Sequence, residues 1–195
     1  MRPLFIPGLV IGTAILVGCG DPTAEGSGRA EALIYDTPAG AATVTGTLQG
    51  NIFASLSPDG TTWTDLGSPN GITVNLQSAS SSTTVHGEQD APTGSYRRVR
   101  LVFDGVTVRL LAGSTVGGTI LENDVTIALG GSDDRVEVVV VVPDFTVEAD
   151  PGVQRTIIFE LSSQVWLTTA ALQAGRVEDA EIQAAMTATT QVDPR

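Results

Sequence analysis

The sequence has few side chains that could act as a nucleophile, a general base or a metal ligand. Its 195 residues include one cysteine, Cys19, and one histidine, His86. A single imidazole excludes a multi-histidine zinc site, and a Ser-His-Asp hydrolase would have to use His86. The chain also has no G-x-S-x-G motif, which presents the nucleophilic serine of many hydrolases. We therefore expect no catalytic residues, no cofactor and no enzymatic activity.

His86 lies in residues 83–88, which read Thr-Thr-Val-His-Gly-Glu. Threonine and valine favour strands, and the glycine that follows favours a loop. We expect a strand histidine that is exposed or half-buried.

The acidic residues are the remaining candidates for chemistry. They gather beside predicted turns in Glu122-Asn123-Asp124, Asp133-Asp134 and Glu148-Ala149-Asp150. Calcium takes about six to eight oxygens from such loops, but no D-x-D-x-D-G spacing occurs. Solvated turn acids are the expectation and calcium stays an unsupported alternative. A glycosidase pair cannot be selected among 22 acidic residues.

All ten basic residues are arginines, and the net charge is −12. A charge of this sign repels nucleic acids, which we exclude as partners. Arg97, Arg98 and Arg100 form a small basic patch in this acidic chain. Arg98 and Arg100 fall on one face of a predicted strand, where we expect pairing with acidic residues across the sheet. An anion or partner site is the alternative.

Cys19 ends a short apolar segment. Arg2 precedes a mostly apolar stretch from Leu4 to Val17, which is followed by Gly18 and Cys19. This is the pattern of a secretory signal peptide, whereas crossing a bilayer takes about 20 apolar residues. Residues 16–19, Leu-Val-Gly-Cys, resemble the lipobox of bacterial lipoproteins. The resemblance implies lipidation of Cys19 and a place in the cell envelope, which we expect to be the outer membrane, facing the periplasm or the surface. An ordinary signal peptide with an incidental cysteine is the alternative.

The predicted division is a signal peptide (1–18), a flexible tether (19–31) and one domain (32–195). Residues 20–30 are small, polar and rich in glycine, as in flexible linkers. The domain shows apolar residues at alternate positions, the period of strands. These sets are Ile72, Val74 and Leu76; Val99, Leu101 and Phe103; Val106, Val108 and Leu110; and Ile157, Phe159 and Leu161. With turn signals between them, among them Asp104-Gly105 and Gly130-Gly131, they predict an all-β antiparallel sandwich.

Two segments are less regular. Residues 136–142 are almost all valine and predict a strand that is covered on both faces or packed near a neighbouring loop. Residues 169–190 are ambiguous between helix and strand. Because Ala180, Ile182, Ala184 and Met186 alternate with mostly polar residues, we expect a loop near Gly175 and then a final strand.

Three stretches that follow one another along the chain resemble a known protein family. They are Trp63-Thr64-Asp65-Leu66, residues 72–76 (Ile-Thr-Val-Asn-Leu) and residues 91–101 (Ala-Pro-Thr-Gly-Ser-Tyr-Arg-Arg-Val-Arg-Leu). The progression resembles a family of uncharacterised bacterial lipoprotein domains, over about residues 42–165. The resemblance implies a transthyretin-like or immunoglobulin-like sandwich and no established catalytic residues. Residues 166–190 match it less well.

Two local motifs predict specific contacts. Residues 57–63, Ser-Pro-Asp-Gly-Thr-Thr-Trp, resemble a shortened Asp-box hairpin of sialidase-type propellers, in which Asp59 caps backbone amides and Trp63 packs beneath. In residues 92–96 we expect Gly94 to turn the chain and Tyr96 to cover the end of the core, with its hydroxyl bonded to nearby backbone, as in a tyrosine corner.

The sequence thus predicts a lipid-anchored cell-envelope protein with a binding or structural β-sandwich. Its expected partners are the membrane, through the Cys19 anchor, and an envelope protein or a glycan. A carbohydrate-binding module is the alternative, with Trp63, Trp166, Tyr35 and Tyr96 as the available aromatic platforms. An envelope hydrolase is the third reading.

Overall fold

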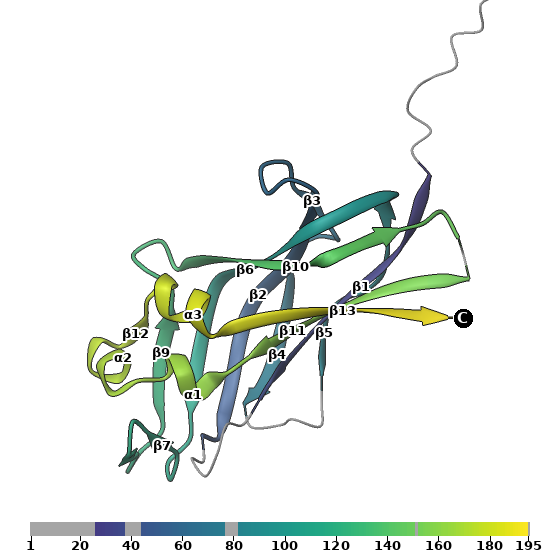
Figure 1. Ribbon diagram of the computed structural model, residues 1–195. Helices are drawn as coiled ribbons and strands as arrows, with labels where there is room; N and C mark the ends of the chain where they lie inside the picture. Colours follow the sequence, from purple (N-terminus) through teal and green to yellow (C-terminus); the bar gives the residue numbers. More distant parts are fainter. Residues whose placement is uncertain (1–25, 38–43, 77–81, 151, 195) are drawn as a thin grey trace, which may run out of the picture.

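The computed structural model describes residues 26–37, 44–76, 82–150 and 152–194, which form two sheets packed face to face (Figure 1). The smaller sheet contains, in spatial order, β13 (Met186–Pro194), β11 (Val153–Leu161), β1 (Ser27–Asp36) and β5 (Thr83–Pro92). The larger sheet contains β12 (Arg176–Val177), β9 (Val125–Leu129), β6 (Gly94–Leu110), β2 (Gly46–Ser57) and β3 (Thr64–Asp65), with β10 (Arg135–Val147) beside β6 and β4 (Asn70–Leu76) beside β2. A small hairpin, β7 (Thr115–Val116) and β8 (Thr119–Ile120), and three short helices complete these elements. The predicted all-β sandwich is confirmed.

The core lies between the two sheets and is built from the alternating apolar positions. All twelve residues of the four predicted sets are buried, with exposed fractions between 0% and 9%. Side chains of both sheets meet there, for example Phe103 of β6 and Phe159 of β11. Since alternate residues of a strand share a face, one face of each strand enters this core and the other meets solvent or loops.

The sequence predicts an antiparallel sandwich, but two pairs of strands in the described part of the chain are parallel. β1 pairs in parallel with β11, and the short β12 pairs in parallel with β9. β1 and β11 are far apart in the chain, and a parallel pair requires a crossover rather than a tight turn. Here the chain between β1 and β11 forms the strands β2 to β10. Local turn signals therefore do not indicate that β1 and β11 pair in parallel.

The first strand begins earlier than expected. β1 starts at Ser27, so residues 27–31 belong to the sheet and not to the tether. Its buried positions include Gly28, Ala30 and Ala32, which are too small to produce a clear hydrophobic alternation. Glycine is required at position 28 by close packing, since a Cβ there would overlap the carbonyl oxygen of Glu148.

The predicted turn at Asp104-Gly105 is wrong, because β6 runs through it as one strand of 17 residues. Gly105 has a φ of 61°, and the pairing with β2 shifts register at the same level, between Gln49 and Asn51. A glycine in a strand interior often marks such a bulge. The bend lets the first half of β6 pair with β10 and the second half with β9.

The C-terminal segment contains helices where the sequence analysis expects a strand. After α1 (Ser163–Trp166) and α2 (Thr169–Ala174), the chain turns at Gly175, which has a φ of 70°, as the expected loop requires. Residues 179–185 then form α3 (Asp179–Ala185), and the final strand begins only at Met186. A capping box between Glu178 and Glu181 starts α3, and Ile182 and Ala185 lie on its buried face. The apolar residues of this segment also alternate at period two, the period of a strand. The prediction of a strand over residues 179–185 rested on that alternation and is wrong.

The valine-rich strand β10 has only one buried face along this segment. Val136, Val138 and Val142 are buried, whereas Val141 is 71% exposed. Its free edge is covered instead by α3. The side-chain amide of Gln183 donates to the Val139 carbonyl and accepts from the Val139 amide, each at 2.9 Å. The amide therefore imitates one residue of a neighbouring strand and blocks pairing at this edge.

The corner between the sheets contains the predicted tyrosine contact. Residues 92–94 connect β5 of the smaller sheet to β6 of the larger one, and Gly94 has a φ of 157°. The Tyr96 hydroxyl donates to the Pro92 carbonyl oxygen at 2.8 Å, and its side chain is only 5% exposed. Its ring packs on that of Phe145, with 5.6 Å between the centroids. Tyr96 thus closes this end of the core, as expected.

Candidate functional site

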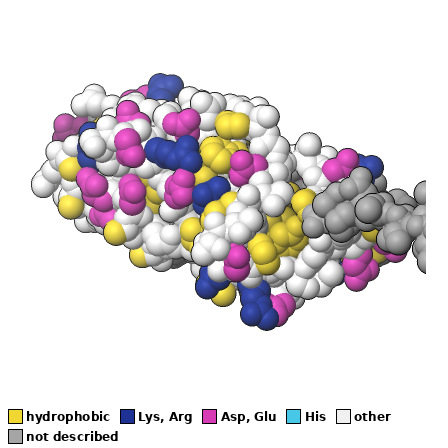
Figure 2. Space-filling view, turned by 90° about the horizontal axis from the view of Figure 1, so that it is seen from above, with side chains coloured by type: hydrophobic (Ala, Val, Ile, Leu, Met, Phe, Trp, Pro, Cys, Tyr) yellow, Lys and Arg dark blue, Asp and Glu magenta, His cyan; other side chains and the backbone are white. Residues whose placement is uncertain are grey.

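Most arginines of the described residues form ion pairs with acidic side chains. Figure 2 shows arginine and acidic side chains next to each other across one face of the molecule. Arg97 forms a bidentate pair with Asp144, at 2.9 and 3.1 Å, and Arg98 donates to the carbonyl oxygen of Asp59 at 2.6 Å. The predicted basic patch is therefore not a free anion site, because its arginines are engaged within the protein.

Arg100 is the centre of a polar cluster on the outer face of the larger sheet. Its guanidinium lies 3.6 Å from Asp65, 3.3 Å from Glu137 and 3.2 Å from the hydroxyl of Ser55. It also lies over the ring of Trp63, 4.6 Å from the ring centroid. The predicted pairing of Arg100 with acids across the sheet is confirmed, and the cluster attaches the β2–β3 hairpin to the sheet.

That hairpin contains the Asp-box-like motif, in which Asp59 caps backbone amides as predicted. The Asp59 carboxylate accepts hydrogen bonds from the amides of Thr61 and Thr62, at 2.8 and 2.9 Å. These donors hold the pKa of Asp59 well below its usual range. The hydroxyl of Ser57 accepts from the Gly60 amide at 2.7 Å. All five groups are used inside the turn, so the motif has a structural role.

The four aromatic candidates for a sugar platform do not meet. Trp166 is fully buried and Tyr96 closes the corner, while Trp63 lies beneath Arg100. Tyr35 is half-buried beside Glu160, and its pKa is raised by burial and by that carboxylate. A stacking surface of two exposed rings is therefore not formed by these residues.

The predicted acidic clusters are likewise turn residues. Asp124 accepts from the Ala112 amide at 3.0 Å and from Arg109 at 2.8 Å, and these hydrogen bonds lower its pKa. Asp150 accepts from the Gly152 amide at 2.8 Å. Within the described ranges, no three His, Cys, Asp or Glu side chains are grouped to hold a metal ion. Cys19 lies outside the described residues.

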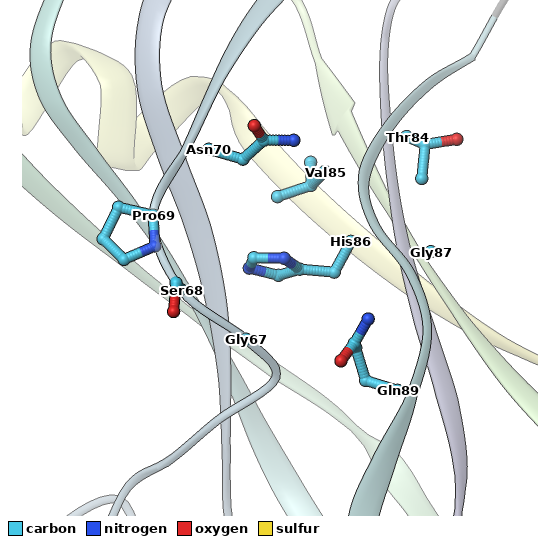
Figure 3. Close-up of a pocket in the computed structure, with 9 residues that line it drawn as sticks. All are labelled: Gly67, Ser68, Pro69, Asn70, Thr84, Val85, His86, Gly87 and Gln89. Carbon is cyan, nitrogen blue, oxygen red and sulfur yellow. The ribbon is translucent and has the colours of Figure 1, made fainter.

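A hollow of about 420 Å³ opens where the edges of the two sheets approach each other (Figure 3). Residues 67–69, from the loop between β3 and β4, and Asn70, the first residue of β4, form one wall. Residues 84–87 and Gln89, from the edge strand β5, form the other. We call it the His86 pocket. It is the candidate functional site.

The backbone of both walls is irregular, and this irregularity forms the pocket. Gly67 has a φ of 146°, and a Cβ at this position would lie 2.9 Å from Nδ1 of His86. Glycine therefore allows the loop to pass directly against the imidazole. On the other wall, the pairing of β5 with β1 shifts register twice around Ala32, which leaves the successive residues Val85 and His86 both buried. Such bulges redirect side chains at sheet edges.

His86 is buried in the pocket and lacks a complete set of partners. Its side chain is 7% exposed, and Nε2 has no hydrogen-bond partner among the described residues. Figure 3 shows the ring pointing from β5 toward Ser68 and Pro69. Burial lowers the pKa of His86, and the negative charge of Asp65 opposes this only in part. The imidazole is therefore neutral at pH 7 and can either donate or accept at Nε2. The histidine is on a strand as predicted, but it is more buried than expected.

The rest of the lining contains no charged side chain. The side chains that carry hydrogen-bonding groups are Ser68, Asn70, Thr84 and Gln89. Hydroxyls and carboxamides both donate and accept hydrogen bonds. The pocket has no pair of acids for glycoside hydrolysis and no arginine for an anion, so its chemistry is that of binding a neutral polar group.

Sequence reasoning found His86 but not its pocket. The loop that covers the imidazole comes from the other sheet, and only Gly67 and Pro69 marked its irregular course. Comparison of the chain with family models, curated proteins and solved structures gave no match.

Proposed function

We propose that the protein is a lipid-anchored cell-envelope protein whose β-sandwich is a binding module. The observation that carries the anchor is the sequence of residues 16–19, Leu-Val-Gly-Cys, directly after an apolar segment of signal-peptide length. A thioether-linked diacylglycerol together with an amide-linked acyl chain gives stable attachment, at about 0.8 kcal/mol for each buried methylene. The resemblance to uncharacterised lipoprotein domains supports the same class.

The position of the first strand is consistent with this anchor. β1 begins at Ser27, eight residues after Cys19. At about 3.5 Å for each extended residue, the sandwich lies within about 28 Å of the lipidated residue. In the part of the chain that the structure describes, no helix is long and apolar enough to cross a bilayer.

The experiment is fractionation of cells that produce the parent or the Cys19→Ser chain. We expect the parent in the membrane fraction after salt and carbonate washes, and the variant released or left unprocessed. Thr23→Ser is the matched control, since it makes an equally small change four residues later and should leave the parent behaviour intact. A Cys19→Ser protein that stays in washed membranes in processed form contradicts the anchor.

Ligand binding, rather than a purely structural role, is favoured by the His86 pocket. A scaffold protein gains nothing from an unpartnered buried imidazole, which costs stability. The neutral polar lining supports the carbohydrate-binding alternative more than the hydrolase, since none of the lining side chains is an acid. The function that we infer for the sandwich is therefore binding without catalysis.

A further inference from the structure

Among the described residues, three buried side-chain nitrogens have no hydrogen-bond partner: Nε2 of His86, Nε of Arg100 and Nε1 of Trp166. Of these three residues, only His86 lines the pocket. Nε2 of His86 is buried, yet it belongs to a side chain that lines an open hollow. Buried polar atoms of native proteins are nearly always hydrogen-bonded, and an exception calls for a specific explanation. A ligand in the hollow supplies that explanation.

The lining residues indicate that this ligand carries no charge. Asn70, Thr84 and Gln89 carry neutral hydrogen-bonding groups, and no charged side chain lines the pocket. The carboxylate of Asp65 acts on His86 through its negative charge, which disfavours an anion. One imidazole with carboxamide oxygens is also a poor set for zinc or copper, which take several nitrogen or sulfur ligands. A neutral ligand remains.

The imidazole indicates which chemical group of the ligand bonds to Nε2. A neutral imidazole has one donor and one acceptor nitrogen, and Nε2 is either, depending on the tautomer. A hydroxyl can donate or accept, so it satisfies Nε2 in both tautomers, whereas a carbonyl satisfies only one. The hydroxyl of Ser68 and the amides of Asn70 and Gln89 can likewise form hydrogen bonds with a ligand that carries several hydroxyl groups.

The volume of the His86 pocket limits the size of the ligand. Small-molecule sites typically measure about 300–1,000 Å³, and the His86 pocket, at about 420 Å³, is near the lower limit. That space accommodates one sugar ring with its first hydration shell, and Pro69 offers an apolar surface to the ring carbons.

We propose that the His86 pocket binds one neutral sugar unit, with hydroxyls bonded to Asn70 and Gln89 and one ring hydroxyl bonded to Nε2 of His86 after the imidazole turns toward the hollow. The proposal deepens the proposed function by naming the ligand class of the binding module, and it rests on that function. Without aromatic stacking the affinity is modest. A ligand of this size, at about 0.3 kcal/mol for each of roughly 12 heavy atoms, has a Kd of the order of 1 mM.

The test uses the fact that His86 is the only histidine, so the imidazole region of a ¹H–¹⁵N NMR spectrum reports this residue alone. The protein is extracted from membranes in a detergent without a sugar headgroup. Glucose, galactose and N-acetylglucosamine are titrated separately, with inorganic phosphate and Zn²⁺ as charged probes. We expect a saturable shift of the Nε2 resonance with at least one neutral sugar, and none with phosphate.

Variants of the wall identify the site. Asn70→Ala and Gln89→Ala should each weaken sugar binding by at least about fivefold, the loss of one hydrogen bond of the usual net strength. Asn75→Ala is the matched control, since Asn75 is an exposed asparagine of the same strand β4 outside the pocket. Circular dichroism of each variant establishes that it is folded.

Three outcomes overturn the proposal. They are no shift with any of the three sugars, saturation by Zn²⁺ at lower concentration than any sugar, and equal loss of binding in Asn75→Ala. None of them changes the fractionation of the parent protein, and a failure of the Cys19 experiment leaves the sugar titration readable, so the two failures are distinguishable.

Discussion

Replacement of Tyr96 is the sharpest test of how the two sheets are joined. Its ring is buried at the corner where the chain crosses from β5 to β6, and its hydroxyl donates to the Pro92 carbonyl oxygen at 2.8 Å. Tyr96→Phe removes the hydroxyl but keeps the ring. Tyr96→Ala removes both and leaves a cavity beside Phe145.

The two magnitudes follow from these contacts. Loss of one hydrogen bond, with the carbonyl left near solvent, costs about 1 kcal/mol for Tyr96→Phe. Truncation of a large buried aromatic costs about 3–5 kcal/mol, and the contact with Phe145 places Tyr96→Ala within that range. For a domain of this size, 1 kcal/mol corresponds to about 2–4 °C in Tm, so Tyr96→Ala should lower Tm by at least about 6 °C.

The assay is chemical and thermal unfolding of the parent and both variants. Thr107→Ala serves as the control, since Thr107 is an exposed residue of the same strand and should stay within about 0.5 kcal/mol of the parent. The reasoning is refuted if Tyr96→Ala unfolds like the parent, or if Tyr96→Phe costs as much as Tyr96→Ala.

Three further predictions concern the pocket, the hairpin and the bend. Because burial lowers the pKa of His86, the unfolded chain takes up a proton near pH 6.5 that the folded chain does not, so the free energy of unfolding should fall as pH drops below about 6.5. Denaturant titrations should show a flatter pH dependence between about pH 7 and 5.5 for His86→Gln, and an equal slope would contradict the buried neutral imidazole. Asp59→Ala removes the acceptor for the amides of residues 61–62, so hydrogen exchange there should accelerate while β6 stays protected, and unchanged exchange would exclude the cap. Gly50 has a φ of 155° and a Cβ there would lie 2.6 Å from the Val106 Cα, so Gly50→Ala should cost about 1–3 kcal/mol in urea unfolding. Gly131→Ala, with nothing within 4 Å, should be nearly neutral, and equal costs for the two would show that the close approach is absent.

The sequence predicted those parts of the fold in which large apolar side chains alternate. Ile72, Val74 and Leu76 are all buried on one face of β4, because a strand that packs one face must repeat at period two. The same signal fails at β1, where the buried side chains include glycine and alanine. It also fails at α3, where Ile182 and Met186 fit both periods and the capping box decides in favour of the helix.

The predicted local motifs were confirmed because each is completed within a few residues. Asp59 caps amides two and three residues later, and Tyr96 bonds to the carbonyl four residues earlier. The His86 pocket could not be predicted in this way. Its walls come from two different sheets, and the register shifts that bury His86 depend on the pairing of β5 with β1, which no local pattern encodes.

The most direct test of the proposed function is the intact mass of the protein purified from membranes. The proposed function predicts a chain that begins at residue 19, with the mass of a diacylglycerol and an amide-linked acyl chain added to Cys19 and no free thiol for maleimide to label. A chain that begins at Met1, or one cleaved elsewhere with an unmodified and maleimide-reactive Cys19, would contradict it.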